Sequence, residues 1–379
     1  MKPLEDYLVI DFSQFLSGPS ASLRLADLGA RVIKIEKPGT GDICRTLYTS
    51  DLIMNGESSV FHTINRNKES FAIDFKQVDE LQKLKKLLAK ADVVMHNFRP
   101  GVMERIGLSY DDVKEINPSV IYGSISGFGT HPDLKDLPGQ DLLLQSLTAL
   151  TWLSGNQDDG PVPMGLSIVD MLAGAHLAQG ILAGLYRKAT HNIGAKIEVS
   201  MLESAYDFQF ETITTHFNDG GELPVRTKSN SAHAYLGAPY GIYQTRNGYL
   251  ALAMGSIPVL ASLLKCDALL EFPENKFVLR DAIKNILASH LQTQNTEFWL
   301  NILEPADIWC ASVLNYQQLF AEDGFKVLDF TQEVQMTDGY QYKTTRCPIK
   351  IDGEYLISGK GSPKLGQDNE RIIKEFIDC

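Results

Sequence analysis

Cysteine and histidine are scarce in this sequence, and neither is spaced as metal or redox chemistry requires. The five cysteines are scattered along 379 residues, and no two of them form a C-x-x-C pair. The eight histidines show no H-x-x-x-H or H-E-x-x-H spacing. A zinc site and a dithiol redox centre therefore have no support. We expect reduced thiols, as in a cytosolic protein, and no bound metal.

Long apolar runs are absent as well. The chain starts MKPLEDYLVIDFSQ, which places Glu5, Asp6 and Asp11 where a secretory signal would be apolar. The sequence contains no run of about 18 uncharged apolar residues, so we predict no membrane span. The net charge of −12 disfavours a non-specific partner of nucleic acid or of anionic membranes. We predict a cytoplasmic globular protein with no nucleic-acid or membrane partner.

Several common catalytic motifs are missing. There is no G-x-x-x-x-G-K-[ST] sequence, which disfavours a P-loop and ATP hydrolysis. The first predicted strand is followed by DFSQFLSGP (11–19) rather than G-x-G-x-x-G, which disfavours a classical dinucleotide site. The segment Gly123-Ser124-Ile125-Ser126-Gly127 resembles a nucleophile elbow, but Ile125 stands where the serine is needed. A serine hydrolase is therefore unsupported.

The first 200 residues alternate between short apolar runs and helical patterns. Strands are predicted at 7–12, 31–36, 70–75, 92–96, 119–124 and 196–201, and helices at 20–28, 77–90, 140–153 and 170–188. This alternation predicts an α/β fold with a mostly parallel sheet covered on both faces. Small residues from Ala173 to Gly184 indicate close backbone packing of the last helix, against another element or another subunit.

The pattern changes after residue 218. Asp219-Gly220-Gly221 is a flexible break, and residues 238–254 read as a β-hairpin that turns at Asn247-Gly248. Helical patterns follow at 259–264, 276–291 and 296–303. We therefore predict a large Rossmann-like α/β domain, residues 1–218 and 335–379, and a small α+β domain, residues 219–334.

Four segments, taken together and in order, resemble the family III coenzyme A transferases, the group of formyl-CoA and carnitine-CoA transferases. They are LSGPSASLRLADLGARVIKIEKPGTGD (16–42), NRNKESFAIDFK (65–76), HNFRPGVMERIGL (96–108) and GLSIVDMLAGAHLAQGILAGLYRK (165–188). The resemblance implies an acyl-CoA:carboxylate CoA-transferase, an acyl-CoA donor, a small organic acid acceptor and an interlocked homodimer. The same superfamily includes α-methylacyl-CoA racemases.

The resemblance implies that Asp170 is the nucleophile. A carboxylate attacks an acyl thioester to give a mixed anhydride, and the CoA thiolate then converts the anhydride into an enzyme–CoA thioester. Coenzyme A is then a co-substrate, and no nucleotide cofactor is needed. An aspartate at a helix start is also commonly an N-cap. The helix N–H groups near Asp170 are candidates for stabilising an oxyanion.

The resemblance also implies which residues contact coenzyme A. Leu16 and Ser17 match the active-site loop beside the pantetheine, although formyl-CoA transferase has glutamine at the position of Leu16. Asn97 and Phe98 match a pair that lies along coenzyme A in formyl-CoA transferases, and Arg105 matches a CoA-contacting arginine of the family. From residue type and position, Lys37 is a further candidate, and Arg66 and Lys68 are candidate phosphate contacts. Lys37 follows a strand and precedes Gly39 and Gly41, so backbone N–H groups lie near its charge.

Two other functions stay open. A racemase needs two bases, and the His-Asp pair expected in that branch is here Gln140-Asp141, so the first base is missing. Gln140 and Asp141 are also candidates for the substrate side, and Asp141 for an N-cap. A CoA-binding protein without turnover is the third alternative. Residues 226–237 lack the glycine run of the formyl-CoA transferase lid, which weakens the case for oxalate as a substrate. The sequence identifies neither donor nor acceptor.

Overall fold

The computed structural model describes residues 2–272 and 277–378, which form two compact units. The large unit comprises Met1–Leu144, Ser167–Phe208 and Leu328–Cys379, and the small unit comprises Gln145–Leu166 and Gln209–Val327. The predicted domain boundaries differ from these at three segments. Residues 145–166 and 209–218 group with the small unit, and residues 328–334 group with the large one.

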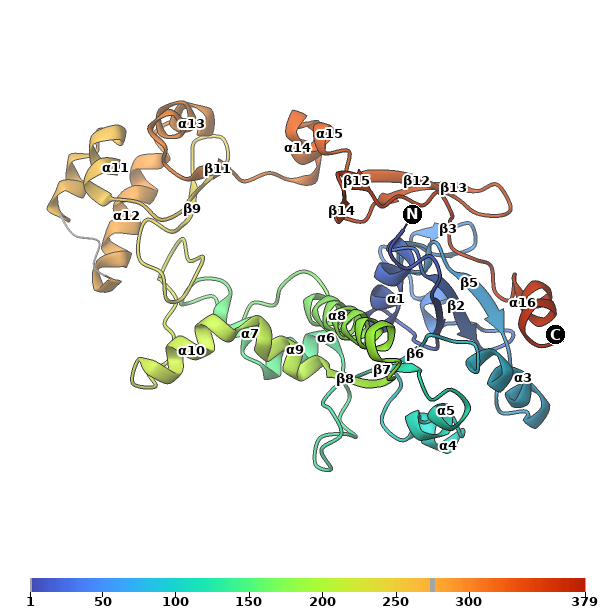
Figure 1. Cartoon of the computed structure of the whole chain (residues 1–379). Coiled ribbons are helices and arrows are strands. Elements are labelled where there is room, and N and C mark those ends of the chain that lie inside the picture. The colour runs from blue at the N-terminus through green and yellow to red at the C-terminus, as the bar shows by residue number, and fades with distance from the viewer. Residues whose placement is uncertain (1, 273–276, 379) are drawn as a thin grey trace. The chain divides into compact units, whose positions relative to one another are not determined.

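A six-stranded parallel sheet forms the centre of the large unit (Figure 1), in the order β5-β2-β1-β6-β7-β8. Its strands are β1 (Leu8–Asp11), β2 (Arg31–Glu36), β5 (Glu69–Ala72), β6 (Val93–His96), β7 (Ile121–Ser126) and β8 (Ala195–Ser200). The order reverses between β1 and β6, and in open α/β sheets ligands bind at such a point, beyond the carboxyl ends of the strands. The predicted parallel α/β fold is confirmed.

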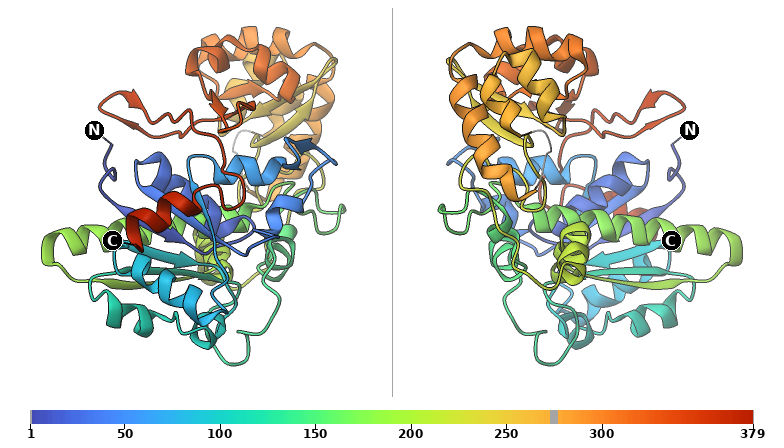
Figure 2. Two further views of the ribbon diagram at one scale, coloured as in Figure 1. Left: turned by 90° about the vertical axis from the view of Figure 1, so that its right-hand side faces the viewer. Right: turned by 90° about the vertical axis from the view of Figure 1, so that its left-hand side faces the viewer.

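One face of this sheet is covered by four helices, α3 (Val78–Leu88), α4 (Val102–Arg105), α5 (Tyr110–Ile116) and α16 (Asn369–Phe376). Strand residues Ile10, Val94 and Tyr122 share one buried apolar cluster with Leu84 of α3 and Ile372 of α16. Figure 2 shows α16, in red, beside α3. Because alternate strand residues point to this face, the apolar strand runs supply cores on both sides of the sheet.

The other face is covered by α1 (Ser17–Asp27) and α8 (Ile168–His191), followed by α9 (Met201–Phe208). Three glycines of α8 permit close contacts. A Cβ atom on Gly174 would lie 2.7 Å from the Ser17 carbonyl oxygen of α1, and one on Gly180 would lie 2.6 Å from a methyl group of β8. One on Gly184 would lie 3.0 Å from Ile121 of β7. The small residues of α8 therefore serve close packing within this chain.

Helix α8 is both long and apolar. Its best 18-residue window has a mean hydropathy of 1.4, and 44% of that window is buried inside the structure. By length and composition such a helix is able to cross a membrane, although the sequence inspection predicted no span. The buried core helix of a globular protein meets the same criterion, so the finding is weak evidence.

The single helix predicted at 140–153 is broken. The chain forms α6 (Asp141–Leu147) and α7 (Leu150–Leu153), separated by Ala149 with a φ of 64°. The apolar periodicity continues across this break, so the sequence pattern alone did not reveal it. The boundary between the two units falls within α6, after Leu144, and α7 belongs to the small unit.

The small unit has a three-stranded antiparallel sheet in the order β11-β10-β9. Its elements include β9 (Gly241–Gln244), β10 (Tyr249–Leu252), β11 (Cys310–Ser312), α10 (Phe210–Asn218), α11 (Ile257–Leu264), α12 (Arg280–Leu291), α13 (Thr296–Leu303) and α14 (Tyr316–Ala321). The predicted hairpin at 238–254 is confirmed. The helix predicted from 276 starts at Arg280, and residue 276 lies outside the described residues.

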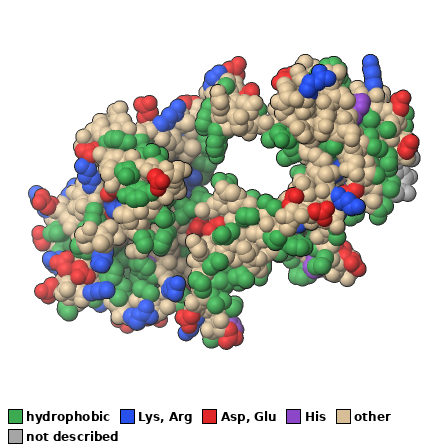
Figure 3. All heavy atoms as spheres, turned by 180° about the vertical axis from the view of Figure 1, so that it is seen from behind, with side chains coloured by type: hydrophobic (Ala, Val, Ile, Leu, Met, Phe, Trp, Pro, Cys, Tyr) green, Lys and Arg blue, Asp and Glu red, His purple; other side chains and the backbone are tan. Residues whose placement is uncertain are grey.

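Shorter elements complete the chain. They are η1 (Ile43–Thr46), β3 (Ile53–Met54), β4 (Glu57–Ser58), α2 (Ser59–Asn65), η2 (Asp267–Glu271), η3 (Phe277–Leu279), η4 (Glu304–Ala306), α15 (Asp323–Leu328), β12 (Thr331–Gln335), β13 (Gln341–Thr345), β14 (Lys350–Ile351) and β15 (Glu354–Tyr355). Figure 3 shows acidic and basic side chains interspersed over the face that it displays, with apolar side chains between them. The negative net charge is thus not gathered into one acidic surface on that face.

Candidate active site

Asp170 lies in the first turn of α8, where its backbone is held by another carboxylate. Asp141, the first residue of α6, accepts hydrogen bonds at Oδ1 from the N–H groups of Val169 at 2.7 Å and Asp170 at 3.1 Å. Asp141 therefore caps the start of α8. These two N–H groups are engaged by Asp141, so they are not the oxyanion donors that the sequence suggested.

The Asp170 side chain is half-buried, and its pKa is raised to about 6. Burial is the largest cause, and the negative charge of Asp141 raises the pKa further. Hydrogen bonds from the Ser17 hydroxyl and the Ser17 backbone N–H act in the opposite direction. Asp170 therefore remains mostly ionised at neutral pH while being more basic than an ordinary aspartate, a combination that suits a nucleophile.

Ser17 is presented by the tight turn between β1 and α1. The amide of Asn97, just after β6, receives a hydrogen bond from Gln14 N at 2.8 Å and donates one to Gln14 O at 2.6 Å. The same amide donates to Ser17 Oγ at 3.3 Å. Gly18 is needed here, because a Cβ atom at this position would overlap Ser13 and lie 3.3 Å from Asn97.

Charged side chains lie fully buried beneath this turn. Lys34 of β2 donates to Ser13 O at 2.6 Å and forms an ion pair with Asp42 at 2.8 Å. Lys68 donates to Pro19 O at 3.0 Å and lies 3.4 Å from the Asp11 carboxylate. Two lysine side chains, each paired with a carboxylate, therefore hydrogen bond to the backbone of this turn.

The predicted phosphate contacts Arg66 and Lys68 have internal partners instead. Arg66 is 2% exposed and binds both carboxylate oxygens of Asp27, at 2.5 and 2.9 Å. Lys68 is fully buried, and burial lowers its pKa to about 7. Neither cation reaches the surface of the unit, so we leave both out of the proposed coenzyme A site. Lysine and arginine side chains are usually exposed, so both were predicted to be accessible. Their carboxylate partners are distant in the sequence, so no local pattern indicates the ion pairs.

The other predicted contacts take three kinds of position. Lys37, beyond β2, and Arg105, at the end of α4, are exposed. Leu16 is half-buried and packs against the apolar cluster that contains Phe61. Phe98 is half-buried and stacks on His96, with the ring centroids 6.0 Å apart. Lys37 and Arg105 are thus accessible to solvent, whereas Leu16 and Phe98 are packed against neighbouring side chains.

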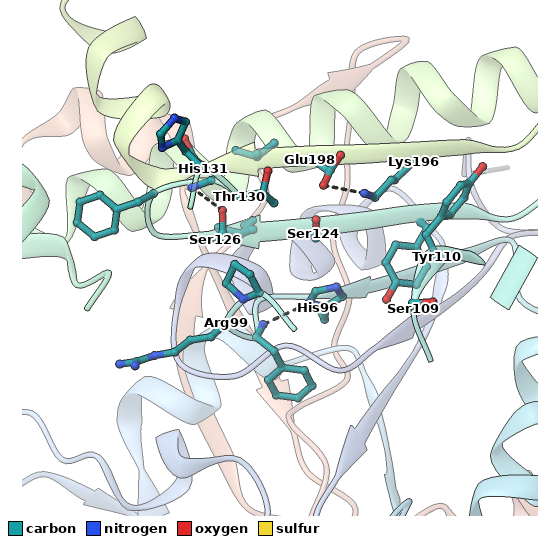
Figure 4. Close-up of a pocket in the computed structure, with 18 of the residues that line it drawn as sticks. His96, Arg99, Ser109, Tyr110, Ser124, Ser126, Thr130, His131, Lys196 and Glu198 are labelled. Carbon is teal, nitrogen blue, oxygen red and sulfur yellow. Dashed lines mark hydrogen bonds and ion pairs between the residues drawn. The ribbon is translucent and has the colours of Figure 1, made fainter. Parts of the chain in front are cut away.

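A cavity of about 690 Å³ opens at the carboxyl ends of β6, β7 and β8. Its lining includes His96, Phe98 and the 2.9 Å ion pair of Lys196 with Glu198 (Figure 4). His96 is buried, which lowers its pKa to about 4, and its Nδ1 accepts a hydrogen bond from Phe98 N. Asp170 and Ser17 do not line this cavity, so it is separate from the carboxylate site.

The two remaining candidates for the substrate side differ in exposure. Gln140 is exposed, and Asp141 is 8% exposed and is engaged by the α8 backbone as described above. Within residues 2–272 and 277–378, no cluster of three or more His, Cys, Asp or Glu side chains is arranged to hold a metal ion.

Three charged side chains of the central strands were predicted neither as buried nor as neighbours of the candidate site. Lys34 and Glu36 stand in a buried strand, and Asp11 ends another, so charges inside apolar strand runs were the available signal. Glu36 is bound by Arg45 at 2.7 and 2.8 Å, which continues the buried charge network toward η1. Buried charges of this kind are paired because unpaired ones are very costly.

The comparisons with known proteins agree on one family. The model of CoA-transferase family III matches residues 4–369. The human succinyl-CoA:glutarate CoA-transferase is 28% identical over 385 residues, covering 100% of this chain and 86% of that protein. The acetyl-CoA:oxalate CoA-transferase of Acetobacter aceti is 31% identical over 388 residues, covering 99% and 96%.

Comparison with solved structures indicates the same family. A crystal structure of a CAIB/BAIF family protein from Brucella suis has a TM-score of 0.84 and 27% sequence identity, and covers 99% of both chains. The family model, the curated relatives and the solved structure all extend over nearly the whole chain. The protein therefore belongs to CoA-transferase family III.

Proposed function

We propose that this protein moves coenzyme A from an acyl-CoA thioester to a carboxylic acid, with Asp170 as the covalent nucleophile. The observation that carries the proposal is the environment of Asp170. Its carboxylate is half-buried, its pKa is raised to about 6, and two hydrogen-bond donors of Ser17 face it. Membership of the family supports the same reading.

The first half-reaction loads the enzyme. The Asp170 carboxylate attacks the thioester carbonyl, the C–S bond breaks, and a mixed anhydride and the CoA thiolate result. The thiolate then attacks the aspartyl carbonyl carbon and expels the donor carboxylate, which leaves an aspartyl-CoA thioester. The acceptor carboxylate reverses these two steps, departs as a new acyl-CoA and regenerates the Asp170 carboxylate. Every bond broken is matched by one formed, so ATP is not consumed.

Ser17 has a defined part in this sequence. When the thiolate attacks the aspartyl carbonyl, negative charge develops on an oxygen of Asp170 itself. The Ser17 hydroxyl and backbone N–H, which hydrogen bond to the Asp170 carboxylate, are then the donors that stabilise this oxyanion. The α8 N–H groups bound by Asp141 are not needed for this step.

Coenzyme A is expected to bind at the carboxyl ends of β1 and β6, where the strand order reverses. Lys37 and Arg105 are the exposed cations proposed for its phosphates, and Leu16, Asn97 and Phe98 are proposed to contact the rest of the molecule. A homodimer stays a prediction from the resemblance, and a cytoplasmic location stays a prediction from the sequence composition. Sedimentation of the purified protein would test the first of them.

The test uses donors and acceptors suggested by the relatives, whose names contain succinyl-CoA with glutarate and acetyl-CoA with oxalate. The protein is incubated with each acyl-CoA, with and without hydroxylamine, and analysed by mass spectrometry. A hydroxamate or CoA adduct on the Asp170 peptide, absent in Asp170→Asn, is expected. No adduct with any donor would contradict the covalent mechanism. Deuterium exchange at the α-carbon in D₂O would then favour the racemase alternative.

A further inference from the structure

Two buried ammonium groups donate hydrogen bonds to the backbone around Ser17, one before this residue and one after it in the sequence. The side chains of Lys34 and Lys68 have no exposed surface. Lys34 Nζ donates to the carbonyl oxygen of Ser13, and Lys68 Nζ donates to that of Pro19. Both cations thus bind the backbone within four residues of Ser17.

The carboxylate partners of these cations bind the same turn. Asp42 pairs with Lys34 through Oδ2, and its Oδ1 accepts a hydrogen bond from Phe15 N at 3.2 Å. Asp11 lies beside Lys68 through Oδ2, and its Oδ1 accepts one from Ser13 N at 2.8 Å. Each ion pair therefore contacts the turn through both of its members.

Stability does not explain these pairs. Replacing a buried ion pair by apolar side chains of similar volume is often neutral or stabilising. The turn itself is strained, because Phe15 has a φ of 61° without being glycine. A strained turn keeps its geometry only where its surroundings fix it, and buried charges with directional hydrogen bonds provide that fixation.

We propose that the ion pairs Lys34–Asp42 and Lys68–Asp11 are a positioning device that holds Ser17 against Asp170. This inference rests on the proposed role of Asp170. The environment of the Asp170 carboxylate is set by burial, Asp141 and Ser17, and neither lysine acts on it directly. The ion pairs therefore affect the Asp170 carboxylate only by fixing the position of the turn and of Ser17.

The test removes one pair without leaving an unpaired charge. In Lys34→Met/Asp42→Asn, methionine fills a volume similar to that of lysine, and asparagine keeps an oxygen to accept from Phe15 N. The matched control is Lys188→Met/Asp92→Asn, which removes a 2.7 Å ion pair at the opposite end of α8. Neither double variant changes the net charge, so long-range electrostatic effects on Asp170 largely cancel.

The main readout is the NMR titration of the Asp170 carboxyl group, assigned by its loss in Asp170→Asn and recorded without substrate. Loss of well-placed Ser17 donors is expected to raise the titration midpoint by about 0.5 to 1 pH unit. The control is expected to titrate like the wild type. Thermal melting of each variant shows whether it is folded, because a purely structural role would lower stability without moving the midpoint.

A second readout asks whether the effect passes through Ser17. In a Ser17→Ala background, removal of the Lys34–Asp42 pair is expected to shift the midpoint by less than it does in the wild type. An unchanged midpoint, equal shifts in both double variants, or full additivity with Ser17→Ala would overturn the inference. Absence of an acyl-CoA adduct in the wild type would contradict the proposed function instead, and the titration would still decide the positioning role.

Discussion

The Asp141 carboxylate accepts a hydrogen bond from the backbone N–H of Asp170 at 3.1 Å, and its charge also raises the pKa of the Asp170 side chain. One residue thus fixes the start of α8 and makes the proposed nucleophile more basic. Ser17 acts in the opposite direction through its two donors. The pKa of Asp170 is about 6 because burial and the charge of Asp141 raise it while the hydrogen bonds from Ser17 lower it.

This balance predicts the pH dependence of adduct formation. Protonated Asp170 is not a nucleophile, so the rate is expected to fall about tenfold per pH unit below the midpoint near 6. Asp141→Asn keeps an oxygen for the helix cap but removes the like charge, which should lower the midpoint. Ser17→Ala should raise it. Hydroxylamine trapping across the pH range measures all three, and shifts in the same direction would contradict the assignment.

The raised pKa also predicts that the nucleophile costs stability. Asp170 has a folded-state pKa of about 6, against the ordinary value of 3.8, so the folded state binds more protons between these two pH values. Stability is therefore lost as the pH rises through 6. Asp170→Asn, which cannot ionise, should be more stable by about 1–3 kcal/mol at neutral pH. Urea unfolding should show this difference vanishing below about pH 4, and a pH-independent difference would contradict the pKa assignment.

Gly174 is expected to be more sensitive than Gly180, although both lie in α8. A Cβ atom on Gly174 would press on the Ser17 carbonyl and on Ser20, whereas one on Gly180 would meet only the side chain of Ile197. Gly174→Ala should therefore displace Ser17 and lower kcat, at a stability cost of about 1–3 kcal/mol. Gly180→Ala is the matched control, with smaller loss because helix propensity offsets strain. Equal kcat values in the two variants would contradict this.

The exposed cations are expected to affect binding of coenzyme A rather than chemistry. Lys37→Gln and Arg105→Gln should each raise the KM for acyl-CoA about three- to tenfold with little change in kcat, because a charge-assisted contact to phosphate is lost. Lys90→Gln, an exposed lysine before β6 and so beyond the amino ends of the strands, serves as the control. Steady-state kinetics at fixed salt measure the effect, and a fall in kcat alone would argue against phosphate binding.

Much of the large unit could be predicted from periodicity, because parallel strands buried on both faces read as apolar runs. The predicted strands at 31–36 and 92–96 match β2 (Arg31–Glu36) and β6 (Val93–His96) closely. The prediction failed where one residue decides the path of the chain. Ala149 breaks the predicted helix at 140–153 by adopting a left-handed conformation, which apolar spacing does not encode.

The candidate site was predictable only in part. The position of Asp170 at a helix start followed from local pattern, and the resemblance gave it a role. The partners of Arg66 and Lys68 lie 39 and 57 residues away in the sequence. Such ion pairs depend on how β1 and α1 come together with the segment between α2 and β5. An isolated cation in the sequence is therefore interpreted as exposed. The capping of α8 by Asp141 was hidden for the same reason.

The last helix, α16, packs against the central sheet, and the residues at its start hydrogen bond to the edge strand β5. Asp368 accepts from Ser70 N and Asn369 bonds to both backbone groups of Ala72, while Ile372 is fully buried against the strands. During synthesis, the small unit, contiguous from 209 to 327 apart from its 145–166 segment, emerges before these residues. The part of the sheet at β5 that α16 covers therefore stays exposed, and the β5 edge lacks these hydrogen bonds, until residues 368–376 have been synthesised, the interval in which a chaperone has most to protect.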